Sequence, residues 1–355
     1  MGAVTKAPPV LARVYRGPHV ESSHRGSLAV ADEKGRLLQG CGDPALPVYA
    51  RSAAKPFQAM PLLLAGGEKR YRLGDAEIAL LCASHGGEPA HVRVARDLLR
   101  RGGFRPDDLE CGAHAPMHEA SARDLVRRGE KPSVLHNNCS GKHAGLLLAC
   151  RALDLPHAGY TEASHPLQRR IRTLLARHAN IPESAITVAV DGCNLPVFRL
   201  PLSALATAYA RLVAGRQPGE DATSAAVRAR IVRAMGKRPD MVAGTGRFTT
   251  DFMNAGRGRW IGKEGAEGVY AVGVLPRGKA AKAFGLVFKL EDGSARPRDA
   301  VTLAALERLG VLPLEIRRAL ATYAEPIVHN ARGVEVGRIE ADVPIAAASR
   351  RRAGK

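Results

Sequence analysis

The chain has 355 residues, of which 45% are hydrophobic, and this is enough for one large core or for a core and a subdomain. The net charge of +19 is compatible with a nucleic-acid or membrane partner, or with an arginine-rich globular surface. We expect neither partner, because aromatic residues make up only 4%, no RNP-like or zinc-finger spacing occurs and no apolar run could span a membrane. Apart from the tail at 349–355, the basic residues are spread along predicted helices.

The N-terminal part of the chain predicts a hairpin and then a helix. The stretches "SLAVAD" and "RLLQG" flank the turn signal "EKG", so residues 27–39 predict two paired strands. A helical pattern follows at 53–64, where Pro56 fits the first turn because its missing N–H costs nothing there.

The rest of the chain alternates unevenly between helices and strands. Apolar spacing predicts helices at 76–83, 90–101, 120–128, 141–152, 164–178, 202–215, 222–236, 298–309 and 313–323. Alternation predicts a buried strand at 185–190, just before Asp191, and further strands at 268–275, 283–290 and 333–343.

Strands therefore lie towards both ends of the chain, and helices fill the middle. Strands that do not alternate one for one with helices favour an α+β fold over a doubly wound sheet. We expect one antiparallel sheet built from the N- and C-terminal strands, with flanking helices and a mostly helical inserted region. The expected division places residues 1–70 and 245–355 in the sheet-containing region and 71–244 in the helical region, with soft boundaries.

Ser52 and Lys55 form an S-x-x-K pattern at the start of the first predicted helix. Three residues are nearly one helical turn, so both side chains face the same way, and a lysine of lowered pKa can activate a serine nucleophile. The serine N–H at a helix start is also a ready donor for an oxyanion. Alone the pattern is weak, since a polar cap and a surface lysine would look the same.

Two further stretches strengthen this pattern. "CASHGGE" places Ser84 after an apolar helix, and "KEG" places Lys263 in a K-x-G pattern just ahead of a predicted strand. An early S-x-x-K and a late K-x-G occur in this order in penicillin-binding proteins and serine β-lactamases. The S-D-N motif of those proteins is absent, and the N-terminus has no signal-peptide pattern. A related scaffold is plausible, whereas the same substrate is not.

The six cysteines do not make a disulfide scaffold in a chain of this length, and we expect a reduced, cytoplasmic protein. Cys139 in "HNNCSGKHAG" and Cys193 in "VDGCNLP" lie in polar loops rather than in apolar helices. Two thiolates and a third ligand would make an open zinc site. Spacing favours His143 as the third ligand over Lys142, because lysine is an uncommon ligand. Alternatively, both cysteines are simply buried apolar residues.

Taken together, "RSAAKPFQA", "CASHGGE", "HNNCSGKHAG", "VDGCNLP" and "KEGAEGVYAVGV" resemble the asparaginase II family of the rhizobial type. The resemblance runs from about residue 10 to residue 345. It implies an L-asparagine amidohydrolase that has the fold of the serine β-lactamases and glutaminases and works as a homodimer.

The resemblance also assigns roles to individual residues. It implies two catalytic Ser-Lys pairs, Ser52 with Lys55 and Ser84 with Lys263. It implies one zinc ion held by Cys139, Lys142 and Cys193, so that Lys142 replaces His143 as the expected ligand. Asp191, His143 and Arg51 are the expected substrate-binding residues.

The expected reaction is hydrolysis of asparagine to aspartate and ammonia through an acyl-enzyme on Ser52, with zinc orienting the substrate. Zinc can also lower the pKa of a bound water to about 7, and this mechanism stays open. The alternative from another class is a β-lactam- or penicillin-binding type of protein, in which Ser52 is acylated without turnover.

Overall fold

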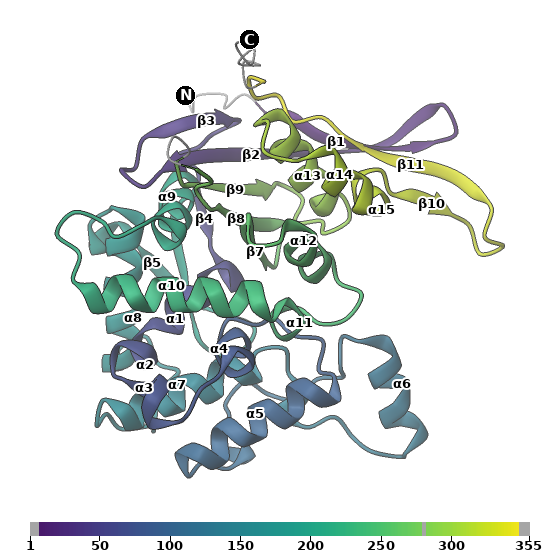
Figure 1. Cartoon of the computed structure of the whole chain (residues 1–355). Helices are drawn as coiled ribbons and strands as arrows, with labels where there is room; N and C mark the ends of the chain where they lie inside the picture. Colours follow the sequence, from purple (N-terminus) through teal and green to yellow (C-terminus); the bar gives the residue numbers. More distant parts are fainter. Residues whose placement is uncertain (1–6, 279–281, 348–355) are drawn as a thin grey trace, which may run out of the picture.

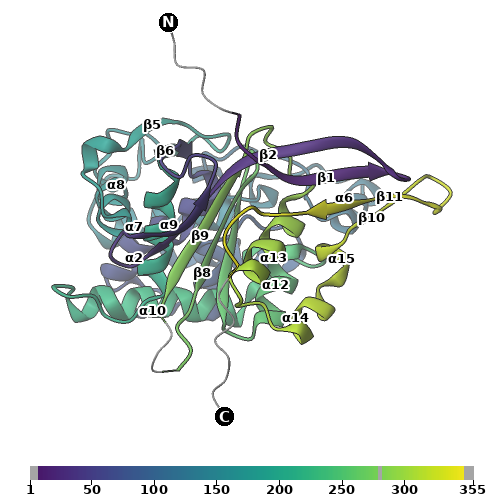
Figure 2. The same ribbon diagram turned by 90° about the horizontal axis from the view of Figure 1, so that it is seen from above.

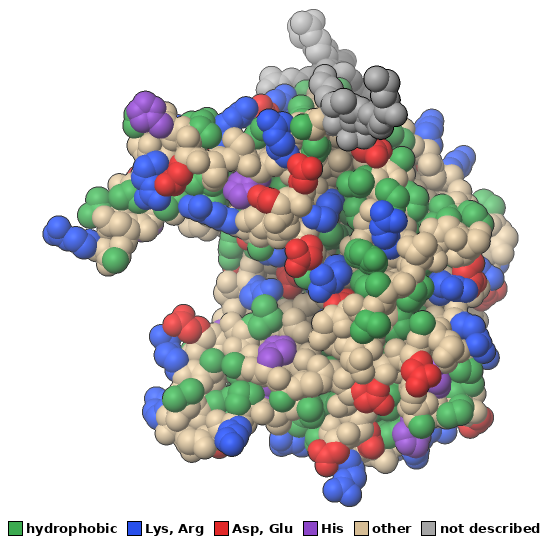
Figure 3. All heavy atoms as spheres, turned by 180° about the vertical axis from the view of Figure 1, so that it is seen from behind, with side chains coloured by type: hydrophobic (Ala, Val, Ile, Leu, Met, Phe, Trp, Pro, Cys, Tyr) green, Lys and Arg blue, Asp and Glu red, His purple; other side chains and the backbone are tan. Residues whose placement is uncertain are grey.

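The computed structural model describes residues 7–278 and 282–347, so the arginine-rich tail at 349–355 lies outside the described residues. Within the described residues, no helix combines the length and the apolar character needed to span a membrane. The face seen in Figure 3 carries basic side chains scattered among acidic and hydrophobic ones, with no single basic patch.

An antiparallel sheet joins the two ends of the chain, as predicted. Its strands follow the order β10-β11-β1-β2-β9-β8-β7, and β3 also pairs with β2 (Figure 1). The strands are β1 (Val10–Arg16), β2 (His19–Asp32), β3 (Leu37–Cys41), β7 (Trp260–Gly265), β8 (Val269–Val274), β9 (Phe284–Leu290), β10 (Ile327–His329) and β11 (Glu335–Ala341). The register pairs Val14 with Ile339 and Ala29 with Val287.

Helices cover both faces of this sheet (Figure 2). Helix α9 (Leu202–Val213) packs on β2, β8 and β9, and α13 (Arg298–Arg308) packs on β1, β8 and β11. Gly285 on β9 allows the close approach of α9, because a Cβ atom there would lie 1.9 Å from the carbonyl oxygen of Ala206. Helix α9 belongs to the expected helical region at 71–244, so this region also supplies a helix that covers one face of the sheet.

The remaining helices form the mostly helical part below the sheet in Figure 1 and a smaller group beside it. They are η1 (Arg51–Ala54), α1 (Lys55–Gln58), α2 (Met60–Leu64), α3 (Gly67–Arg70), α4 (Asp75–Leu81), α5 (Pro89–Gly102), η2 (Pro106–Asp108), α6 (Glu119–Arg127), η3 (Val134–His136), α7 (Ser140–Ala152), α8 (Pro166–Ala179), η4 (Glu183–Ala185), α10 (Ala222–Lys237), α11 (Pro239–Val242), α12 (Phe248–Gly256), α14 (Leu314–Ala319) and α15 (Ala321–Ala324).

Three local predictions were wrong in detail. The helix expected at 53–64 is divided into η1, α1 and α2, and both α1 and α2 begin next to a proline, Pro56 and Pro61, whose missing N–H cannot continue the preceding hydrogen bonding. The helix expected at 313–323 is likewise divided into α14 and α15. The strand expected to be buried at 185–190 is β5 (Thr187–Val190), an edge strand whose Val190 is 74% exposed.

A second, smaller antiparallel sheet brings two distant segments together. Its order is β4-β6-β5, with β4 spanning Pro47–Tyr49 and β6 spanning Pro196–Pro201. Strand β4 leads directly into η1, and the turn between β5 and β6 carries residues 191–195. The small sheet therefore places the S-x-x-K segment beside the loop that contains Asp191 and Cys193.

Candidate active site

The segment around Ser52 is held by contacts on both sides. The Ala50 N–H donates to Phe198 O at 2.9 Å, and the Tyr209 hydroxyl donates to Ala53 O at 2.7 Å. Between them, Arg51 has a φ of +47°, a left-handed conformation that is uncommon for a residue with a side chain. Such backbone strain persists only where the surroundings enforce it, and it is concentrated at functional sites.

The hydroxyl and the backbone N–H of Ser52 are both free of hydrogen bonds to the described residues. The side chain is partly exposed, and no residue in the described ranges hydrogen-bonds to its hydroxyl or to its backbone N–H. The next N–H, of Ala53, is already bound to Ala50 O at 3.0 Å. Because η1 has only four residues, the oxyanion donor expected here is the single N–H of Ser52 rather than the end of a long helix.

Ser84 lies between two buried lysines. The amines of Lys55 and Lys263 each donate to Ser84 Oγ at 2.9 Å, and Lys55 also donates to Ala83 O. Lys55 is 1% exposed, Lys263 0% and Ser84 4%. Lys55 is therefore bonded to Ser84 rather than to Ser52. The two expected Ser-Lys pairs meet as one connected group, with Ser52 next to it.

Lys263 lies just ahead of the predicted strand, which is β8, and is itself part of strand β7, which was not predicted. All six residues of this strand are buried, and its backbone pairs with β8. Burial, together with the charges of Lys55 and Arg247, lowers the pKa of Lys263 to about 7 against the opposing effect of Glu264. Lys263 can therefore change its protonation state near neutral pH, as a proton-transfer group must.

Cys139, Lys142 and Cys193 form a second buried group that adjoins the first. Lys142 Nζ lies 3.0 Å from Cys193 Sγ, and Lys55 Nζ lies 3.2 Å from Cys139 Sγ. The pKa of the Cys139 thiol is held well below its usual range by a hydrogen bond from Cys193 and by the charges of Lys142 and Lys55, against the effect of burial. Burial alone would lower the pKa of Lys142, but the two sulfur atoms outweigh it and raise that pKa.

The three expected substrate-binding residues are not all in one place. Arg51 donates to Asp191 Oδ1 from Nε at 3.3 Å and from Nη2 at 3.0 Å, and both side chains are partly exposed beside Ser52. His143 is 0% exposed, and its Nδ1 lies 2.7 Å from the Tyr160 hydroxyl. Arg51 and Asp191 can thus reach a bound molecule, whereas His143 is fully buried.

With this geometry established, a model of the family described as L-asparaginase II matches residues 12–341. The chain belongs to the L-asparaginase II family. Membership in this family supports amide hydrolysis, with a small-molecule amide as the substrate. No curated protein matches the chain significantly.

The chain is also similar to two crystal structures of Mglu. The native form is 18% identical over 82% of this chain and 66% of the Mglu chain, with a TM-score of 0.44. The tris and glutamate form is 14% identical over 89% of this chain and 63% of that one, with a TM-score of 0.34. The chain thus spans slightly less than two thirds of the length of either structure. At these TM-scores, neither likeness carries an argument about activity.

In this L-asparaginase II chain, sequence reasoning missed a charged group next to Lys263. The Glu264 carboxylate accepts hydrogen bonds from Arg247 Nη2 at 2.9 Å and from Thr249 Oγ1 at 2.7 Å, and its Oε1 lies 3.8 Å from Lys263 Nζ. Burial would raise the pKa of Glu264, but Lys263 and Arg247 lower it to about 2. Glu264 could have been predicted as a site residue, because it is the middle residue of the K-x-G pattern. No motif around Arg247 indicated that Arg247 belongs to the site.

Proposed function

We propose that the chain hydrolyses the side-chain amide of L-asparagine to L-aspartate and ammonia through an acyl-enzyme on Ser52. The observation that carries the proposal is the line of hydrogen bonds from Lys55 through Ser84 to Lys263, which begins three residues after Ser52, whose hydroxyl has no partner among the described residues. Family membership supports the amide bond as the target. The strained segment before Ser52 supports its role as the nucleophile.

Acylation begins when Ser52 attacks the side-chain carbonyl carbon of asparagine. Lys55 takes up the proton that Ser52 loses, as a lysine acting as general base does. The N–H of Ser52 donates to the oxygen that becomes negatively charged, a contribution of about 3–4 kcal/mol for such a donor. The C–N bond then breaks, leaving aspartyl-Ser52.

The leaving nitrogen needs a proton to depart as ammonia. Lys263 is joined to Lys55 through Ser84 Oγ, so a proton can pass along this line to the nitrogen. A water molecule then attacks the ester carbonyl by the reverse sequence of proton transfers. This releases aspartate and restores the Ser52 hydroxyl.

We propose that the charged pair beside Ser52 binds the two charged ends of asparagine. Asp191 offers a carboxylate for the substrate ammonium, and Arg51 offers a guanidinium for the substrate carboxylate. We further propose that the scaffold is that of the serine β-lactamases. The S-x-x-K segment at a helix start and Lys263 on edge strand β7 of an antiparallel sheet support this proposal.

The function is tested by measuring ammonia release from asparagine, glutamine and a β-lactam ester in parallel. Glutamine is one methylene longer, and we expect its kcat/KM to be lower than that of asparagine by about 10–200-fold. Equal kcat/KM for the two amides would show that the site does not discriminate between side chains of different length. Acylation by the β-lactam without ammonia release from either amide would favour the acyl-serine binding protein instead.

The pKa of Lys263 predicts a pH dependence. The protonated amine supplies the proton to ammonia, so kcat/KM for asparagine should fall as the pH rises through about 7 and the lysine loses its charge. Glu264→Gln removes a charge that raises the pKa of Lys263, and should therefore move this fall to lower pH.

The matched control is Glu183→Gln, which removes one carboxylate that pairs with Arg172 away from the site and should leave the profile unchanged. A rate that rises through pH 7 would instead make Lys263 the base.

The residues Cys139, Lys142 and Cys193 fit a zinc ion. Among the described residues, no group of three His, Cys, Asp or Glu side chains lies close enough to hold a metal. We propose Lys142 as the ligand beside the two sulfur atoms, because its Nζ lies 3.0 Å from Cys193 Sγ. Its amine is already at hydrogen-bond distance from Cys193 and must lose a proton to bind. Zinc bound there would supply a positive charge next to Asp191 that helps to orient the substrate.

Metal content tests this fit directly. We expect about one zinc per purified chain, and its loss in Cys193→Ala, with binding that strengthens as pH rises because the ligands must deprotonate. Cys150→Ala is the matched control, since Cys150 is a buried cysteine on α7 outside the cluster. Full zinc content in Cys193→Ala, or none in the unaltered protein, would contradict the assignment. Turnover that persists with a raised KM after zinc loss would agree with a role in orientation.

A further inference from the structure

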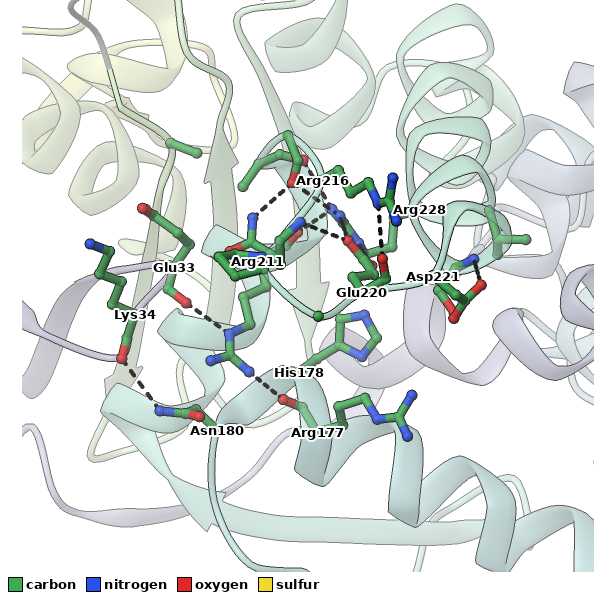
Figure 4. A pocket seen from close by; sticks show the side chains of 18 of the residues that line it. Glu33, Lys34, Arg177, His178, Asn180, Arg211, Arg216, Glu220, Asp221 and Arg228 are labelled. Carbon is green, nitrogen blue, oxygen red and sulfur yellow. Dashed lines mark hydrogen bonds and ion pairs between the residues drawn. The ribbon is translucent and has the colours of Figure 1, made fainter.

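A cavity of about 940 Å³ lies apart from the Ser-Lys group. It opens where the C-terminal ends of α8 and α9 meet the start of α10 and the turn between β2 and β3 (Figure 4). No residue of the Ser-Lys or cysteine groups lines it. Its volume is at the upper end of the range that holds small-molecule ligands, about 300–1,000 Å³.

The wall of this cavity has an excess of unpaired positive charge. Its basic residues without an ion pair to any residue in the described ranges are Lys34, Arg177, Arg211, Arg216 and Lys282. Two of the acidic residues of the wall are already engaged, since Glu220 pairs with Arg228 and Asp221 accepts from Ser224 N–H. The protein is basic overall, but here several cations without an ion pair line one open pocket, which suits a ligand with a phosphate-like group.

Two acceptors in the wall have no hydrogen-bond partner among the described residues, and of these two atoms only Glu33 Oε2 is fully buried. His178 is 7% exposed, and its Nδ1 donates to Leu174 O at 2.8 Å, so Nε2 is an acceptor that no described residue satisfies. Burial lowers the pKa of His178 to about 4, which keeps the ring neutral. Glu33 Oε2 is also buried without a hydrogen-bond partner among the described residues. A ligand must therefore bring N–H or O–H donors as well as negative charge.

Apolar side chains complete the wall and define the rest of the ligand. They are Met60, Leu64, Leu174 and Val227. A nucleoside phosphate has all the required parts: phosphates for the guanidinium groups, a flat base with an N–H donor for His178, and ribose hydroxyls for Glu33. Inorganic phosphate lacks the flat body, and a free nucleoside lacks the charge.

The cavity is connected to the catalytic segment through aromatic contacts. The ring of His178 lies 5.5 Å from that of Phe57, and the ring of Phe57 lies 5.8 Å from that of Tyr209. Phe57 is two residues after Lys55, and Tyr209 donates to Ala53 O, next to Ser52. A ligand that fixes His178 can therefore shift the helix that holds the nucleophile.

We propose that this cavity binds a nucleoside phosphate, which regulates the Ser52 site through Phe57 and Tyr209. The regulatory part rests on the proposed asparagine hydrolysis, whereas binding itself does not. A failure of ligand binding can therefore be distinguished from a failure of the proposed asparagine hydrolysis.

The test uses calorimetric titration of the full chain with ADP, pyrophosphate and adenosine as separate probes. We expect one ADP per chain, with pyrophosphate and adenosine each at least about tenfold weaker. Arg177→Ala with Arg216→Ala should weaken ADP and pyrophosphate alike by about tenfold or more. His178→Phe keeps a ring against Phe57 and should weaken ADP while leaving pyrophosphate unchanged.

The matched control is Arg170→Ala, which removes one exposed cation from α8 outside the cavity and should leave ADP affinity unchanged. No ADP binding, or binding that the cavity variants do not weaken, would overturn the proposal. Pyrophosphate that binds as tightly as ADP would overturn the nucleoside part. Saturating ADP should change kcat or KM for asparagine by about fivefold or more, and an unchanged rate with ADP bound would overturn the coupling.

Discussion

Ser52→Ala should lower kcat for asparagine by at least roughly 10³-fold, because no other group can form the acyl-enzyme. Folding should be unaffected, since the Ser52 side chain makes no hydrogen bond to a described residue and is only partly buried. Aspartate should still bind, because Arg51 and Asp191 remain. The measurement is steady-state ammonia release, together with thermal unfolding and aspartate titration.

The informative comparison is Ser84→Ala, because Ser84 is the serine that is hydrogen-bonded to the two lysines. Ser84 accepts from both Lys55 and Lys263, so its loss breaks the proton path but leaves the nucleophile in place. We expect a smaller loss than in Ser52→Ala, with the acyl-enzyme still formed. More than a few per cent of activity in Ser52→Ala, with none in Ser84→Ala, would reverse the two roles.

Lys55→Arg should be as inactive as Lys55→Met, with kcat reduced by at least roughly 10³-fold in both. Arginine keeps the positive charge but does not give up its proton at any working pH, so it cannot act as the base. Methionine keeps the length of the side chain without the amine. Steady-state kinetics on the two variants shows whether Lys55 acts as a general base or only as a fixed positive charge.

Lys55 is 1% exposed, and arginine is the larger side chain, so thermal unfolding must accompany the kinetics. A folded arginine variant with substantial activity would show that Lys55 works through its charge. A folded methionine variant with substantial activity would remove Lys55 from the chemistry.

Most of the fold could be predicted because local patterns and long-range pairing agreed. Helices such as α5, α7 and α10 have clear apolar spacing, and their observed bounds differ from the predictions by at most one residue at either end. The strand β7 was missed because its sequence, "WIGKEG", contains two charged residues and two glycines. The two charged residues, Lys263 and Glu264, are buried because they belong to the candidate site. The strand therefore lacks the usual alternation of apolar and polar residues.

The members of the candidate site could be predicted, but their connections could not. Each motif is local, yet Lys55 bonds to Ser84, which lies 29 residues away, and Arg51 bonds to Asp191, which lies 140 residues away. Spacing along a helix correctly placed Ser52 and Lys55 in one short segment, but it did not show that the lysine amine turns to Ser84. Such contacts follow from how α4, β7 and the small sheet pack around η1, and sequence spacing carries no information about this packing.

The most direct test of the central claim is to stop the reaction with L-asparagine by rapid acid quench and to map the peptides by mass. The account predicts one aspartyl group on the peptide that contains Ser52, present during turnover and absent once the asparagine is consumed. Turnover with an aspartyl group on the Ser84 peptide, or with no acylated peptide at any quench time, would contradict it.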